Sequence, residues 1–251
     1  MIKSICFLIF LGVNLTAFAQ SSDEGTIKQL FDEALSKGKS YEMLYDLSVN
    51  IGPRLSGSPG AAASVEWSRH RMEDFGFDSV WLQPVMVPHW VRGMKEIGRI
   101  NSKKMGTVEV NVCSLGGSVG TGPSGIAASV VEVKSFDELK SLGTKGVQGK
   151  IVFFNRPMDP TKINTFSAYG GAVEQRASGA SEAAKYGAVA VLVRSMGSNL
   201  EDYPHTGSMR YAPNIVKIPA LAISTRQAEL LSKLLKDEKD VQFYMENHSV
   251  T

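Results

Sequence analysis

The chain has 251 residues, of which 27 are Lys or Arg and 25 are Asp or Glu, so its formal net charge is +2. The basic and acidic residues are interspersed, and no basic face or tail of the kind that binds nucleic acid is indicated. The length allows one large domain or two smaller domains with cores of their own.

Residues 1–19 have the pattern of a secretory signal peptide. Lys3 supplies a positive charge, an apolar stretch runs from Ile5 to Phe18, and small residues stand at the last and third-last positions before Gln20. We predict cleavage after Ala19, secreted or periplasmic localisation, and no membrane association after cleavage. The alternative is a retained anchor, which the polar residues within the apolar stretch disfavour.

Residues 20–118 are predicted to form one segment that begins with three helices. Apolar residues recur at helical spacing over 27–35 and 41–47, and a third helix begins at Ser58-Pro59 and ends at Gly76. An extended segment over 79–87 and a hairpin joining 94–100 to 106–112 follow. Because few of these could be central strands, the apolar faces need a sheet from elsewhere, and we predict that this part is unstable alone.

A glycine-rich run covers residues 116–125 and shows no apolar periodicity. Gly120, Gly122 and Gly125 have the spacing of a dinucleotide-binding fingerprint, which must follow a strand and open a helix. Here the run contains Pro123 and leads into a β-branched segment. We therefore interpret the run as a hinge between two units and not as a nucleotide site.

Residues 119–246 alternate between strand and helix patterns, which is typical of an α/β domain. Helices are expected after the capping boxes Ser135-x-x-Glu138 and Ser224-x-x-Gln227, and over the small residues 173–186. A long loop covers residues 195–217. The predicted strands cover residues 126–133, 150–155, 188–194, 218–223 and 241–245.

Sequence spacing indicates no catalytic or metal-binding residue in this chain. A hydrolytic zinc site usually shows H-E-x-x-H or H-x-D spacing, but no acidic residue lies within two positions downstream of His70, His89, His205 or His248. Ser118 has the literal G-x-S-x-G spacing within the glycine-rich run, but that run leads into a β-branched segment and not into the helix that a nucleophile elbow opens. Cys113 is the one cysteine beyond the predicted signal peptide, so no intramolecular disulfide is expected in the mature chain.

The loop over residues 203–211 gathers polar and aromatic side chains, among them His205, Arg210 and Tyr211. Loops of this kind are exposed and often functional. An ordinary surface loop whose aromatic residues cover the edge of a sheet would have the same composition, and composition alone leaves both interpretations open.

Two parts of the sequence resemble known zinc exopeptidases. The segment Ile51-Gly-Pro-Arg-Leu-Ser-Gly-Ser58, followed by a helix, resembles the N-terminal motif of the aminopeptidase and carboxypeptidase Q family. Segments 147–154, 185–192 and 218–223 resemble a protease-associated (PA) domain and occur in the expected order, and loop 203–207 is similar to the corresponding loop of carboxypeptidase Q-like enzymes. The resemblance covers essentially the whole predicted mature chain.

The resemblance implies an α/β fold class: the incomplete N-terminal part of a doubly wound zinc-peptidase domain over residues 20–118, plus an inserted PA domain over residues 119–246. Residues 247–251 would lead back towards the remainder of the catalytic domain. Family members bind two zinc ions through residues that follow the insert. The implied parent is a secreted metallopeptidase that hydrolyses short peptides or dipeptides, with a homodimer as one option at full length. This chain alone is expected to bind no zinc and to be inactive.

The resemblance also implies a role for the long loop. The inserted domain of the family lies over the active-site cleft, so His205, Arg210 and Tyr211 are candidate substrate contacts, and the planar guanidinium of Arg210 suits a peptide carboxylate. Arg54 could face the cleft, but a structural tie to the preceding helix is favoured. The rival interpretation is a PA module that binds peptides or partners without catalysis.

Overall fold

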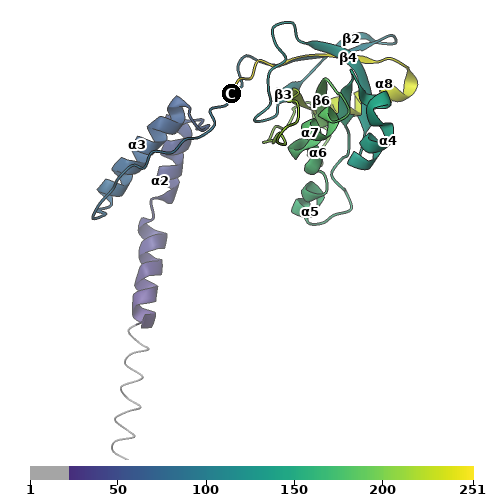
Figure 1. The fold of residues 1–251 in the computed structure, drawn as a ribbon. Helices are drawn as coiled ribbons and strands as arrows, with labels where there is room; N and C mark the ends of the chain where they lie inside the picture. Colours follow the sequence, from purple (N-terminus) through teal and green to yellow (C-terminus); the bar gives the residue numbers. More distant parts are fainter. Residues whose placement is uncertain (1–22) are drawn as a thin grey trace, which may run out of the picture. The chain divides into compact units, whose positions relative to one another are not determined.

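The computed structural model describes residues 23–251, so the predicted signal peptide lies outside the described residues. The chain divides after Val85 into two compact units, which we call unit 1 (described from residue 23 to 85) and unit 2 (residues 86–251). In Figure 1 unit 1 is purple to blue, and unit 2 runs from teal to yellow. Within residues 23–251, no helix has both the length and the apolar character needed to cross a membrane.

Unit 1 is helical throughout its regular structure. Residues 23–37 form a helix, followed by α2 (Ser40–Tyr45), a π-helical turn η1 (Asp46–Ile51) and α3 (Pro59–Asp74). The predicted start of α3 is confirmed, because the Ser58 side chain accepts a hydrogen bond from the Ala61 N–H at 3.1 Å and proline occupies the first helical position. The predicted extended segment 79–87 is wrong: it has no regular structure, since the described part of unit 1 offers no strand to pair with it.

The helices of unit 1 leave their apolar side chains in solvent. No residue between 23 and 85 is buried, and Phe31 and Leu35 are 62% and 83% exposed. A polar contact joins η1 to α3: Asp46 accepts hydrogen bonds from Asn50 within η1 and from the Trp67 indole of α3. The Asn50 bond, followed by the Trp67 bond, lowers the pKa of Asp46. Unit 1 therefore holds together by surface contacts and lacks a core.

Unit 2 is built on one eight-stranded sheet with the order β2-β1-β8-β4-β5-β6-β7-β3. Strands β4 to β7 are parallel neighbours, and the remaining pairs are antiparallel. The predicted hairpin is confirmed as β1 and β2. The strands are β1 (Ile97–Ser102), β2 (Gly106–Val110), β3 (Val112–Ser114), β4 (Ile126–Val133), β5 (Ile151–Phe154), β6 (Ala190–Arg194), β7 (Ala220–Ile223) and β8 (Gln242–Glu246).

The helices of unit 2 begin at the predicted caps. Ser135 accepts a hydrogen bond from the Glu138 N–H at 3.1 Å, and Ser224 accepts one from the Gln227 N–H at 3.2 Å. The single helix predicted over 173–186 is two short helices, because the backbone of Ser178 leaves the helical region. The helices are α4 (Phe136–Val147), α5 (Thr165–Gly170), α6 (Glu174–Ala177), α7 (Gly179–Ala184) and α8 (Thr225–Asp237).

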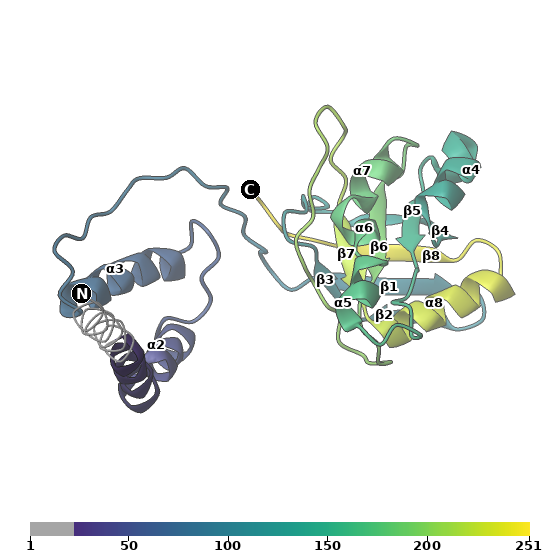
Figure 2. The same cartoon turned by 90° about the horizontal axis from the view of Figure 1, so that it is seen from below.

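Two apolar cores lie on opposite faces of this sheet. Successive residues of β5 alternate between them: Ile151 and Phe153 pack in the core with α8, whereas Val152 and Phe154 pack in the core with α4 and α7. Figure 2 shows α8 on the opposite side of the sheet from α4 and α7. Strands buried on both faces explain the continuous apolar runs in the sequence.

The glycine-rich run is not a hinge, and the interpretation given to it above is wrong. It lies inside unit 2, since the strands before and after it belong to the same sheet, and unit 2 begins at residue 86 and not at 119. A Cβ at Gly120 would lie 2.9 Å from the carbonyl oxygens of Asn247 and Ser249. Gly125 has a φ of +68°, and a Cβ there would meet the Tyr244 ring. The glycines therefore allow close packing of backbone against other parts of the unit.

Candidate functional site

The carboxyl ends of the parallel strands meet at one edge of the sheet, where open α/β sheets bind ligands. Asn155 follows β5, Arg194 ends β6, and Ser224 follows β7. All three are buried, with exposed fractions of 4%, 6% and 0%. The long loop 195–217 also begins at this edge, so the sequence-predicted residues of unit 2 lie on a segment that the sheet itself positions.

The first part of the loop is anchored through Ser195. Its hydroxyl donates to the Ile223 carbonyl at 2.7 Å and accepts from the His205 N–H at 2.8 Å. The His205 imidazole in turn lies 2.7 Å from the Glu201 carboxylate, and its side chain is 46% exposed. His205 is thus held by its backbone and presents a partly solvated ring.

The second part of the loop is fastened to the segment after β3. The Thr206 hydroxyl donates to the Ser114 carbonyl at 2.6 Å. Gly116 donates its N–H to the Gly207 carbonyl at 2.9 Å and accepts from the Met209 N–H at the same distance. These bonds leave little backbone freedom around residues 205–209.

The three sequence-predicted loop residues have different environments. Arg210 is exposed, and its guanidinium has no hydrogen bond or ion pair within the described part of the chain, so it is available to an anionic ligand. The Tyr211 hydroxyl donates to the Ile218 carbonyl at 2.7 Å and accepts from the Val119 N–H at 3.0 Å, and burial raises its pKa. Tyr211 therefore serves the fold through its hydroxyl.

Arg54 belongs to unit 1, whereas the other three predicted residues belong to unit 2. Its guanidinium donates to the carbonyl of Leu47 in the first turn of η1 and to the carbonyl of Gly52, which follows η1. This is the structural tie that the sequence favoured for Arg54.

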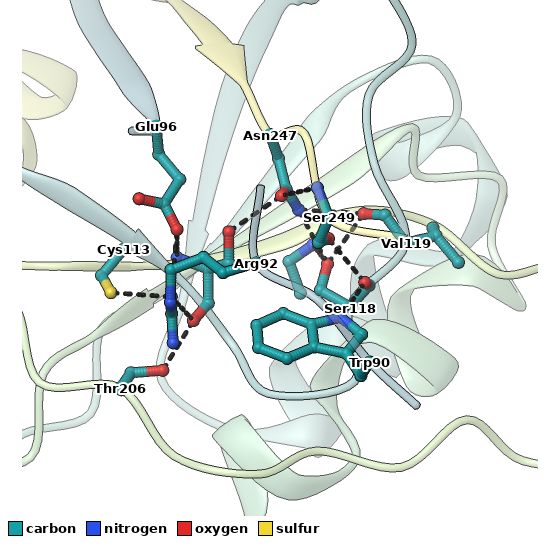
Figure 3. A network of polar contacts seen from close by, with 11 residues as sticks. Trp90, Arg92, Glu96, Cys113, Ser118, Val119, Thr206, Asn247 and Ser249 are labelled. Atoms are coloured by element: carbon teal, nitrogen blue, oxygen red, sulfur yellow. Dashed lines mark hydrogen bonds and ion pairs between the residues drawn. The ribbon is translucent and has the colours of Figure 1, made fainter. Parts of the chain in front are cut away.

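The first and last segments of unit 2 lie next to each other, and we call this place the junction (residues 90–96 and 247–250). Val91 and Val250 exchange both backbone hydrogen bonds, each at 2.9 Å. The Trp90 indole donates to the Ser118 carbonyl at 2.9 Å, and the Ser249 hydroxyl donates to the same oxygen at 2.7 Å (Figure 3). The Ser118 carbonyl, in the glycine-rich run, therefore binds both the first and the last segment of unit 2.

Asn247 lies at the centre of the junction and is 1% exposed. Its side-chain oxygen accepts from the Ser114 hydroxyl at 2.8 Å and from the Ser249 N–H at 3.0 Å. Its side-chain nitrogen donates to the Ser118 hydroxyl at 3.1 Å and to the Val119 carbonyl at 2.9 Å (Figure 3). All of its hydrogen-bonding capacity is used.

A charged pair completes the junction. The Arg92 guanidinium lies 3.0 Å from the Glu96 carboxylate and donates to the Ser114 carbonyl at 2.8 Å and to the Cys113 sulfur at 3.0 Å (Figure 3). Burial raises the pKa of the Cys113 thiol, and the positive charge of Arg92 opposes this in part. Burial would also raise the pKa of Glu96, but the hydrogen bonds from Ser114 and then Arg92 outweigh it, so that the pKa is lowered.

Glu96→Gln is expected to reduce the acid sensitivity of unit 2. A carboxyl whose pKa is lower in the folded than in the unfolded chain stabilises the fold above the unfolded value of about 4.3, and this contribution disappears as the pH falls through the folded value. We expect the variant to be about 1–2 kcal/mol less stable at pH 7 and to lose less stability between pH 5 and pH 3. Urea unfolding at several pH values measures this. Glu109→Gln, at a carboxylate whose side chain is 80% exposed, is the control, and an equal acid response in both variants would contradict the assignment.

The described residues do not fit a zinc site. No group of three His, Cys, Asp or Glu side chains within residues 23–251 converges on one point. The His205–Glu201 pair brings together one imidazole and one carboxylate, whereas a catalytic zinc takes three protein ligands.

Sequence reasoning missed the junction residues and Arg194. Asn247 stands in an unremarkable local pattern, and it meets Ser118 only when β8 and the glycine-rich run are brought together. One signal was available: a glycine-rich run with no periodicity can indicate close backbone approach as well as a hinge.

Comparison with known proteins first defines the class. No family model matches the chain. Its fold is similar to that of a peptidase M28 precursor from Shewanella amazonensis SB2B, with a TM-score of 0.81 and 32% identity over 92% of this chain and 51% of that chain. A zinc aminopeptidase from Bacillus subtilis shares the fold with a TM-score of 0.50 and 19% identity, over 84% of this chain and 43% of that one. The mixed α/β architecture is therefore that of M28 peptidase structures.

The sequence comparison narrows the relationship. The chain is 38% identical to carboxypeptidase Q from Bos taurus over 199 residues. These residues cover 79% of this chain and 40% of that protein. The predicted resemblance is thus confirmed, and the chain is a carboxypeptidase Q-like sequence. It spans about half the length of the curated relatives it matches, from 39% to 53%.

Proposed function

We propose that the chain is the N-terminal part of a secreted, zinc-dependent metallopeptidase that hydrolyses short peptides, and that unit 2 contains its PA domain. The observation that carries this proposal is the 38% identity to carboxypeptidase Q over 79% of the chain. The TM-score of 0.81 to an M28 peptidase precursor supports it independently.

The junction supports the proposal that unit 2 is an inserted domain. A domain inserted into another must begin and end at neighbouring points, and Val91 and Val250 are hydrogen-bonded neighbours. The buried contacts of Asn247 and Ser249 hold the two chain ends together.

The loop would supply the substrate contacts of this domain. Arg210 has a free guanidinium suited to a peptide carboxylate, and the partly solvated ring of His205 lies on the same anchored loop. Tyr211 would contribute through its ring, because its hydroxyl is already bonded within the fold. In this proposal Arg54 keeps its structural role.

We propose that the longer protein binds two zinc ions. When bound, zinc would make a water molecule nucleophilic at neutral pH. Because the described residues bring no three ligands together, we propose that the ions are held by residues outside them and that the chain alone is inactive. Zinc content and dipeptide hydrolysis of residues 20–251, measured beside a longer product of the same locus, test this. Metal and turnover in the longer product alone are expected, and stoichiometric zinc in the short chain would overturn the proposal.

Arg210→Ala is expected to weaken dipeptide use by the longer product. Losing a charge-assisted bond to the substrate carboxylate should lower kcat/KM by about tenfold, mainly through KM. Steady-state kinetics on dipeptides and on their C-terminal amides measure this, because the amides lack the carboxylate. Arg99→Ala, at an arginine of the β1–β2 hairpin, is the matched control. An unchanged kcat/KM for Arg210→Ala would remove the loop from substrate binding.

A second candidate is a binding module without catalysis. The two cores of unit 2 are complete in themselves, which favours an independently folded platform for peptides or partner proteins. Peptide binding by the short chain, without a longer product of the locus that has peptidase activity, would favour this candidate.

A further inference from the structure

A cavity of about 280 Å³ opens at the carboxyl ends of β5 and β6, beside the long loop. Arg194, the last residue of β6, lines it together with segments 157–168 and 197–200. Unlike the exposed Arg210, Arg194 is a buried cation at the edge of the sheet, with only 6% of its surface exposed. Neither the junction nor the proposed substrate loop uses it.

The orientation of the Arg194 guanidinium is held from both sides. One terminal nitrogen donates to the Asn155 side-chain oxygen at 3.1 Å and to the Glu229 carboxylate at 2.6 Å. Asn155 is itself fixed by a bond to Glu132 at 2.7 Å. The Nε atom of Arg194, however, is buried and has no hydrogen-bond partner within residues 23–251. A buried donor without a partner has a cost of roughly 1–3 kcal/mol, so the hydrogen-bonding capacity of this guanidinium is incompletely satisfied by the fold.

The charge of the cavity lining suits an anion. Besides Arg194, the residues that line this cavity include a second cation, Lys162, and one carboxylate, Asp159. Asp159 is committed to Thr161, accepting from its N–H at 2.9 Å and from its hydroxyl at 2.7 Å. The Glu229 carboxylate faces Arg194 from α8 with 55% of its side chain exposed, so solvent weakens its hold on the guanidinium.

An apolar surface continues from the cavity. A second cavity of about 250 Å³ shares Met158 and Thr165 with the first, and adds Phe166, Tyr169 and Met196. Phe166 is 87% exposed at its rim, although a large apolar side chain gains free energy from being covered. An occupant of both cavities would place an anionic group near Arg194 and an apolar group against Phe166.

We propose that this pair of cavities binds a small carboxylate that carries a large apolar group, such as the free C-terminus of a peptide ending in an apolar residue. The guanidinium of Arg194, a lining residue of the first cavity, binds the carboxylate, and Met158, Phe166 and Tyr169 contact the apolar group. The site is separate from Arg210 and does not depend on the proposed peptidase activity, because it acts by binding alone.

The test uses ligands without a scissile bond and the chain from residue 20 to 251. Binding of 3-phenylpropionate, 3-phenylpropanamide and propionate is measured by calorimetry and by NMR shifts. We expect 3-phenylpropionate to bind with a Kd on the order of 1 mM, and the amide and propionate to bind about tenfold more weakly. Equal binding of acid and amide, or no binding of 3-phenylpropionate at about ten times that concentration, would overturn the proposal.

Variants assign the two halves of the site. Arg194→Gln should abolish the preference for acid over amide, whereas Phe166→Ala should weaken both ligands and keep the preference. Phe166 is so exposed that its variant is expected to fold, which keeps the test valid if Arg194→Gln does not. Arg99→Ala, at an arginine of the β1–β2 hairpin that lines neither cavity, is the control for general charge effects. A Phe166→Ala variant with unchanged affinity for 3-phenylpropionate would also contradict the proposed site.

Discussion

Residues 20–85 produced alone are expected to remain largely unfolded, whereas residues 86–251 are expected to fold cooperatively. Between residues 23 and 85 no side chain is buried, and apolar residues such as Leu30, Phe31 and Leu35 are more than half exposed. Ordering a residue costs about 1–2 kcal/mol of backbone entropy, and exposed contacts cannot offset this. Unit 2 has two apolar cores on the faces of one sheet.

Circular dichroism and urea titration of the two pieces, with limited proteolysis of residues 20–251, test this expectation. Unit 1 should show weak helicity without a cooperative transition, and protease should remove it before cutting unit 2. Unit 2 should unfold in a single transition. If residues 20–85 resist protease as well as residues 126–245 do, the absence of a core in unit 1 is not what limits its stability.

The parts of the fold that could be predicted from the sequence are those that local chemistry decides. Ser58, Ser135 and Ser224 each cap a helix through the N–H three residues later, and this needs no information from distant parts of the chain. The buried strands of the parallel sheet also show in the sequence, as short apolar runs bounded by polar residues.

The errors arose where tertiary structure decides. Strand β1 pairs with β8 at the other end of unit 2, so the hairpin that looked like part of the first segment belongs to the second. Residues 79–87 have strand-like composition but no partner in the described part of unit 1. A domain boundary based on glycine content therefore fell inside a sheet.

Only the loop part of the candidate site could be predicted, because its side chains are close together in the sequence. The loop with His205 and Arg210 was visible because imidazole, guanidinium and phenol groups cluster locally. Arg194 is invisible in this way, since its significance lies in burial, in an unpartnered Nε, and in the cavity that distant segments line.

Asn247→Asp is expected to destabilise unit 2 by about 3 kcal/mol or more, and more than Asn247→Ala does. The aspartate replaces two donated hydrogen bonds, to the Ser118 hydroxyl and the Val119 carbonyl, by a carboxylate oxygen facing the Val119 carbonyl at 1% exposure. It also buries a charge without a cationic partner among the groups that Asn247 contacts. Alanine leaves the Ser114 hydroxyl and the Val119 carbonyl without these partners but adds no charge.

Urea unfolding of residues 86–251 at pH 7 measures these differences, and Asn101→Asp is the matched control. Asn101 accepts from the Thr107 hydroxyl at an exposed position of the hairpin, which a carboxylate can equally do, so its substitution should change stability by less than about 0.5 kcal/mol. Because a protonated carboxyl can again donate, Asn247→Asp should recover part of its deficit relative to Asn247→Ala as the pH falls towards 4. Equal stability of the two Asn247 variants at pH 7 would mean that the junction admits water in solution, and that the paired chain ends are held by the Val91–Val250 bonds and not by Asn247.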